Sequence, residues 1–124
     1  MEDTYRKFLN PLFDTSTLNF DAFVGLASEV LETKELHQKV LGKVVYSLGS
    51  KYGEKDIFKL AEAIEGNTGR KISPSTLRSY KWVYDKLKHA IETNLIPEDW
   101  SYTAWRYLAS TKEPEAWIKR GVDG

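Results

Sequence analysis

Apolar residues recur along this chain at intervals of three and four, which is the spacing of one face of an α-helix. One such stripe comprises Phe20, Phe23, Val24, Ala27 and Leu31. A second comprises Leu36, Val40, Leu41, Val44, Val45 and Leu48. The sequence has no alternating apolar–polar stretch of the length that a half-buried strand needs. The pattern therefore predicts an all-α fold, a compact helical domain of about six to seven helices.

Capping residues, glycines and prolines divide this pattern into elements. Asn10-Pro11 ends a first helix, Asn19 or Asp21 can cap the second, and Ser101 can cap a helix after Pro97. The expected helices cover about residues 3–9, 20–31, 34–47, 54–64, 74–93, 102–110 and 114–119. A loop is expected between Gly49 and Gly53, and residues 66–72 could alternatively hold a short β-hairpin.

The sharpest local signal is the start of the helix after residue 73. The Ser73 hydroxyl can accept a hydrogen bond from an exposed amide of the first turn. Pro74 suits the first helical position, where its missing N–H costs nothing. Small hydroxyl residues and basic residues follow, in the segment STLRSYK. A helix that presents such groups from its first turns is what reading the major groove of DNA requires.

Charge is distributed unevenly, although the net charge of the chain is zero. Residues 70–89 contain six Lys or Arg and one Asp, whereas residues 1–36 contain three Lys or Arg and seven Asp or Glu. A basic run is often only a solvated face. Its coincidence with the Ser-Pro start of the helix favours a functional role for the same segment.

Length and composition indicate one domain, residues 1–124, rather than two. Within it we distinguish N-terminal helices (1–49), a central pair of helices (54–93) and C-terminal supporting helices (98–121). The sequence has no cysteine, which excludes disulfides and thiolate metal sites. The N-terminus does not resemble a signal peptide, and no apolar run reaches the roughly 18 residues of a membrane span. We expect a cytoplasmic protein without a membrane partner or a bound metal.

The segments LAEAI and ISPSTLRSY resemble the two helices of helix-turn-helix DNA-binding proteins of bacterial phages and plasmids. The matching positions are Leu60, Ala61, Ile64, Ile72, Ser73, Ser75, Leu77, Arg78 and Tyr80. The resemblance covers roughly residues 50–121 and implies a transcription regulator that binds double-stranded DNA as a dimer. The usual turn has a single glycine where this chain has seven residues, Glu65–Lys71, so the predicted turn is six residues longer.

The resemblance and the side-chain chemistry together suggest roles at the DNA. Short hydroxyl side chains and one arginine would read base edges: Ser75, Thr76, Arg78 and Ser79. The residues expected at the DNA backbone are Arg70, Lys71, Ser73, Lys81 and Lys86. Trp82 lies on the expected outward face and could contact DNA, a second subunit or the N-terminal helices. The alternative to a base-reading role is that Arg78 is only a solvated surface arginine.

Other constellations support little chemistry. His37 and His89 have no partner spacing that indicates catalysis, and no paired carboxylates lie in an apolar setting, so we expect no enzyme and no cofactor. Aromatic residues at helical spacing, such as Tyr102 and Trp105, are expected in the core. The apolar stripes of residues 12–48 could form a homodimer surface or core. The competing interpretation of the whole chain is an all-helical protein–protein interaction module, for example a phage protein that binds a host partner.

Overall fold

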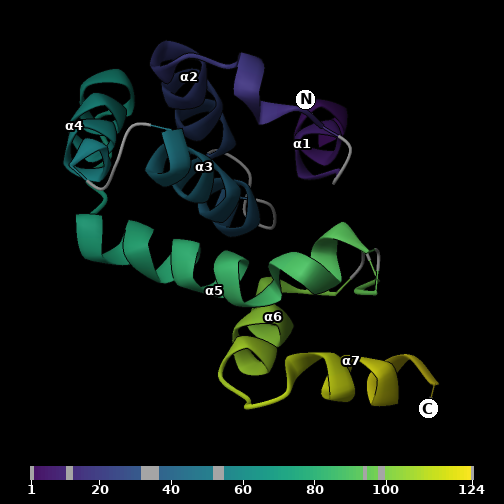
Figure 1. The fold of residues 1–124 in the computed structure, drawn as a ribbon. Coiled ribbons are helices and arrows are strands. Elements are labelled where there is room, and N and C mark those ends of the chain that lie inside the picture. Colours follow the sequence, from purple (N-terminus) through teal and green to yellow (C-terminus); the bar gives the residue numbers. More distant parts are fainter. Residues whose placement is uncertain are drawn as a thin grey trace.

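A computed structural model describes residues 2–10, 13–31, 37–51, 55–93, 95–97 and 100–123 (Figure 1). These residues form seven α-helices and no strand, which confirms the predicted all-α fold. The helices are α1 (Glu2–Leu9), α2 (Phe20–Val30), α3 (His37–Lys51), α4 (Asp56–Thr68), α5 (Pro74–Glu92), α6 (Tyr102–Ala109) and α7 (Pro114–Asp123), with one 3-10 turn (Thr15–Thr17) between α1 and α2. None of the described helices has the length and apolar character needed to cross a membrane.

The long helix α5 separates the other helices into two groups (Figure 1). Helices α1 to α4 lie on one side of it, and α6 and α7 lie on the other. Apolar side chains from the first group and from the first half of α5 form one core cluster. The second half of α5 forms a second cluster with Trp105 and Leu108 of α6 and Ile118 of α7. The first half of α5 packs mainly on the first group, and its Tyr80 also meets Tyr102 of α6.

The contact between α3 and α5 is close because α3 carries a glycine there. A Cβ atom built on Gly42 would lie 2.7 Å from the carbonyl oxygen of Tyr80 and 3.3 Å from Cβ of Tyr84. Side chains normally hold helix axes 8–10 Å apart, and a residue without a side chain lets the backbones approach further. Gly42 therefore helps to fix how α5 lies across the N-terminal helices.

The apolar stripes of α2 and α3 are buried within the chain. Phe23, Ala27, Val40, Leu41 and Val44 are all fully buried in the first cluster. Of the two interpretations of these stripes, core and dimer surface, burial in the core is the one observed. Leu36, part of the second predicted stripe, lies outside the described residues.

Two predicted helix ends were wrong. Helix α3 continues through Gly49 to Lys51, where a loop was expected, and Gly53 lies outside the described residues. Helix α4 continues four residues beyond Ile64 to Thr68, so no hairpin forms in residues 66–72. It ends at Gly69, whose φ of 72° is the left-handed conformation that glycine adopts without strain.

One buried lysine fastens α1 to α3. The side chain of Lys43 is 5% exposed, and its ammonium group donates to the carbonyl oxygens of Phe8 and, at 3.2 Å, Asn10. Its Nζ atom also lies 5.0 Å from the centre of the Phe8 ring. Burial lowers the pKa of Lys43 to about 8. The unpaired carbonyls at the end of α1 are thus satisfied by a side chain of another helix.

Candidate nucleic-acid interface

The start of α5 has the predicted geometry. The amide of Thr76 donates to the Ser73 hydroxyl at 3.1 Å, and the two side-chain hydroxyls of these residues lie 2.9 Å apart. Pro74 occupies the first turn. No acidic residue lies in that turn, so the positive end of the helix dipole is not neutralised locally. The predicted cap is therefore confirmed.

The outward face of α5 is also largely as predicted. Ser75, Arg78 and Ser79 are exposed, and Trp82 is 45% exposed. Thr76 is half-buried. On the inner face Leu77, Tyr84, Leu87 and Ile91 are buried, while Tyr80 is only half-buried and Val83 and Ala90 join the core.

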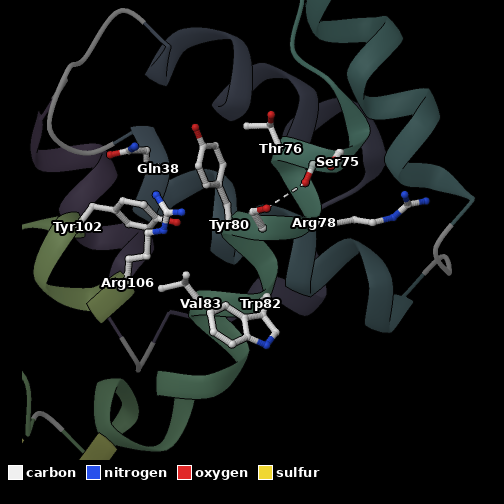
Figure 2. Close-up of a pocket in the computed structure, with 10 residues that line it drawn as sticks. Gln38, Ser75, Thr76, Arg78, Tyr80, Trp82, Val83, Tyr102 and Arg106 are labelled. Atoms are coloured by element: carbon white, nitrogen blue, oxygen red, sulfur yellow. Dashed lines mark hydrogen bonds between the residues drawn. The ribbon is translucent and has the colours of Figure 1, made fainter. Parts of the chain in front are cut away.

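These outward residues form one wall of a groove of about 640 Å³ (Figure 2). The groove is lined by Gln38, Ser75, Thr76, Arg78, Ser79, Tyr80, Trp82, Val83, Tyr102 and Arg106. All four residues predicted to read bases are among them, together with Trp82. The lining includes two arginines and no carboxylate. Its charge is therefore positive, and an anionic ligand would meet no repulsion from the walls.

The hydroxyl groups of the groove differ in the hydrogen bonds that they can still make to a ligand. Ser79 Oγ donates to the backbone oxygen of Ser75 at 3.2 Å, the bond drawn in Figure 2. That bond uses the hydroxyl proton of Ser79 and leaves its lone pairs able to accept from a ligand. Burial raises the pKa of the Tyr102 phenol, with a further increase from Tyr80. Tyr102 therefore keeps its proton at neutral pH.

Arg78 extends from the rim of the groove toward α4 (Figure 2). Its guanidinium carbon lies 5.1 Å from the centre of the Phe58 ring, and Phe58 is itself 51% exposed. Stacking on an aromatic ring leaves the N–H groups at the edge of the guanidinium able to donate to a ligand. The arginine is thus partly ordered, but its donors are not consumed by the contact.

The residues predicted at the DNA backbone do not form one patch. Arg70 Nη1 donates to the carbonyl oxygen of Leu31 at 2.8 Å, so the connection between α4 and α5 is held against the end of α2. Lys71 is exposed nearby, and Ser73 serves as the cap. Arg70, Lys71 and Ser73 thus lie together at the start of α5.

The other two predicted backbone residues lie elsewhere. Lys81 is half-buried beside α3, where its Nζ would lie 3.3 Å from a Cβ on Gly49. Lys86 is exposed at the far end of α5 and lines a second cavity with residues of α7. Two of its neighbours there are Glu113 and Glu115.

Three groove residues from outside α5 were not predicted from the sequence as site residues: Gln38, Tyr102 and Arg106. Gln38 comes from α3, and the other two come from α6, one turn apart. The ring of Tyr102 meets that of Tyr80 edge to face, with centroids 5.6 Å apart. The only sequence signal was the i, i+4 spacing of Tyr102 and Arg106, which gives no indication that α6 lies beside the exposed half of α5.

The remaining candidate residues have structural partners. Trp105 is buried and Tyr102 half-buried between α5 and α6, as expected for core aromatics. Nδ1 of His89 hydrogen-bonds the carboxylate of Glu115, which joins α5 to α7. His37 meets Tyr80 edge to face, with centroids 6.4 Å apart. In the described part of the chain, no three His, Cys, Asp or Glu residues are grouped in a way that could hold a metal ion.

Comparison with protein families, characterised proteins and solved structures found no match to this chain. The resemblance to helix-turn-helix proteins therefore rests on the residues alone. The geometry relevant to it is that the first four of the seven residues predicted to form the turn, 65–71, belong to α4, and that residues 69–73 join α4 to α5.

Proposed function

We propose that this protein binds double-stranded DNA through the first half of α5. The observation that carries the proposal is the groove beside this half-helix, whose lining includes two arginines and no carboxylate. Phosphate contacts supply a large share of the affinity of DNA-binding proteins, and carboxylates beside the cations would repel the phosphates. The short side chains of Ser75 and Ser79 on the exposed face would let the helix come close to base edges.

Each residue of the site then has a defined task. Arg78 reads a base edge with its two parallel donors, and Ser75, Thr76 and Ser79 contribute hydroxyl contacts. The phosphates beside the start of α5 are contacted by Arg70 and Lys71. The two other basic residues predicted at the DNA backbone, Lys81 and Lys86, do not line the groove and take no part in this contact.

A regulator from a phage, plasmid or bacterial chromosome is the biological role that this activity would serve. Such readers usually bind as homodimers to two half-sites about 34 Å apart. Because the apolar stripes of α2 and α3 are buried, a dimer would have to use another surface. Trp82 and Phe58 are large, exposed side chains, and they are the candidate contacts for such a dimer surface.

A protein–protein interaction module is the second candidate, and one observation favours it. Tyr107 is 67% exposed and lies at a shallow depression of α6 together with Trp100, Ala104 and Leu108. Exposed aromatic surface of this kind is common where proteins meet. The depression has no charged residue, so it would suit an apolar partner rather than DNA.

The test is binding of a duplex that the wild type selects from a random-sequence library, compared among the wild type, Arg78→Ala and Arg120→Ala at two salt concentrations. Arg120 is the matched control, because its guanidinium carbon also stacks on an aromatic ring, 5.2 Å from Trp117 in α7. We expect salt-dependent binding that Arg78→Ala weakens and Arg120→Ala leaves intact. Absence of wild-type binding at low salt, where non-specific association is strongest, would contradict the proposal.

A further inference from the structure

Helix α6 supplies a second wall to the groove of α5. It contacts α5 directly and projects Arg106 toward the groove, next to Tyr102 (Figure 2). The Arg106 side chain is exposed, so its guanidinium can reach a ligand without any rearrangement of the core. Tyr102 and Trp105 on the same helix are packed against α5 and hold the wall in place.

Within the described part of the chain, Arg106 keeps its positive charge. Among the residues that the structure describes, no carboxylate forms an ion pair with it. Its neighbours in the groove, Gln38 and Tyr102, are uncharged, and burial keeps the pKa of the Tyr102 phenol raised. The guanidinium therefore retains its full attraction for an anion.

Two other surface cavities of the described chain differ from this groove in the charged residues that line them. In the cavity between α5 and α7, Lys86 and Lys119 share the lining with Glu113 and Glu115, so the charges balance. The depression on α6 around Tyr107 has no charged residue in its lining. Of these three sites, only the groove with Arg106 combines cations with the absence of carboxylates.

We infer that Arg106 contacts the phosphate backbone of the same DNA duplex whose major groove receives α5, so that the binding site spans two helices. This inference rests on the proposed function. A duplex is wider than one helix, and the strands that flank its major groove pass beside an inserted helix. An arginine held beside α5 by α6 would meet one of these strands and fix the orientation of α5, without reading sequence.

The inference is tested through the salt dependence of binding. A phosphate contact contributes about 0.9 to the slope of log affinity against log salt on duplex DNA. We expect Arg106→Gln to lower that slope by about 0.9 and to weaken binding by the same factor on unrelated duplex sequences. Arg106→Lys, which keeps the charge, should retain the wild-type slope, and Arg120→Gln controls for loss of a remote charge.

Three outcomes separate the inference from the proposed function. A lower slope for Arg106→Gln alone, with Arg106→Lys and Arg120→Gln like the wild type, supports it. Wild-type binding with an unchanged slope for Arg106→Gln would overturn the role of Arg106 and leave the proposed function standing. No wild-type binding at low salt would overturn both. Circular dichroism of each variant confirms that the helices are intact.

Discussion

Replacing Gly42 with alanine tests the close contact that positions α5. The new Cβ would lie 2.7 Å from the carbonyl oxygen of Tyr80, a distance that real Cβ atoms essentially never show. The oxygen belongs to the backbone of α5 and cannot rotate away as a side chain could. The two helices must therefore move apart, and this shifts α5 relative to Gln38 of α3 in the groove.

The size of the effect follows from two opposing contributions. Alanine is intrinsically better than glycine inside a helix by roughly 0.5–1 kcal/mol. Overpacking a dense contact costs about 1–3 kcal/mol, and a clash with rigid backbone belongs at the upper end of that range. We therefore expect Gly42→Ala to lower the free energy of unfolding by about 2 kcal/mol.

The matched control is Gly66→Ala in α4. A Cβ at Gly66 would have no atom within 4 Å, so only the intrinsic preference for alanine remains. This variant should be more stable than the wild type by roughly 0.5–1 kcal/mol. Urea unfolding followed by circular dichroism measures both. If Gly42→Ala proved as stabilising as Gly66→Ala, the account of the α3–α5 contact would be refuted.

Three further predictions concern single contacts. Ser73→Ala removes the acceptor for the Thr76 amide and should lower the free energy of unfolding by about 1 kcal/mol, measured by urea titration. Burial lowers the pKa of Lys43 from 10.5 to about 8, so the unfolded chain holds the proton to higher pH and stability should rise from pH 8 toward 10.5. Lys43→Met should abolish the rise that this group contributes, and an unchanged profile in a pH series of unfolding curves would contradict the assignment. Glu115→Gln removes the negative charge from an exposed contact with His89 and should cost less than about 1 kcal/mol in a thermal melt, since exposed ion pairs contribute little.

The sequence predicted the elements whose signals are local. Ser73 and Pro74 define the start of α5 because a cap depends only on neighbouring atoms. The stripe through Val40 and Val44 predicted a buried helix face, and both residues are fully buried. Capping residues and apolar periodicity are therefore sufficient to predict where such a helix begins and which of its faces is buried.

Helix ends at glycines were less predictable. Gly49 was expected at the start of a loop and Gly66 within the turn after Ile64, yet α3 and α4 run through them, and Gly69 terminates α4 with a positive φ. Glycine permits a left-handed residue but does not require one. Which glycine adopts that conformation depends on how the neighbouring helices pack.

That several helices line the groove could not be predicted from the local sequence pattern. Arg106 and Tyr102 reach it only because α6 packs against α5, a tertiary contact that no spacing in the sequence encodes. The same applies to Lys81, which charge counting grouped with the DNA-binding residues and which lies beside α3. A charge run along a helix is divided between its faces once the helix is packed.

The proposed DNA contact surface is the groove between α5 and α6. The most direct measurement is a titration of isotopically labelled protein with a DNA duplex, followed by backbone amide chemical shifts. We expect the largest chemical-shift changes on residues 75–83 and on Tyr102–Arg106, with α7 unaffected. Changes centred on Tyr107 and α7, or no change at low salt, would contradict it.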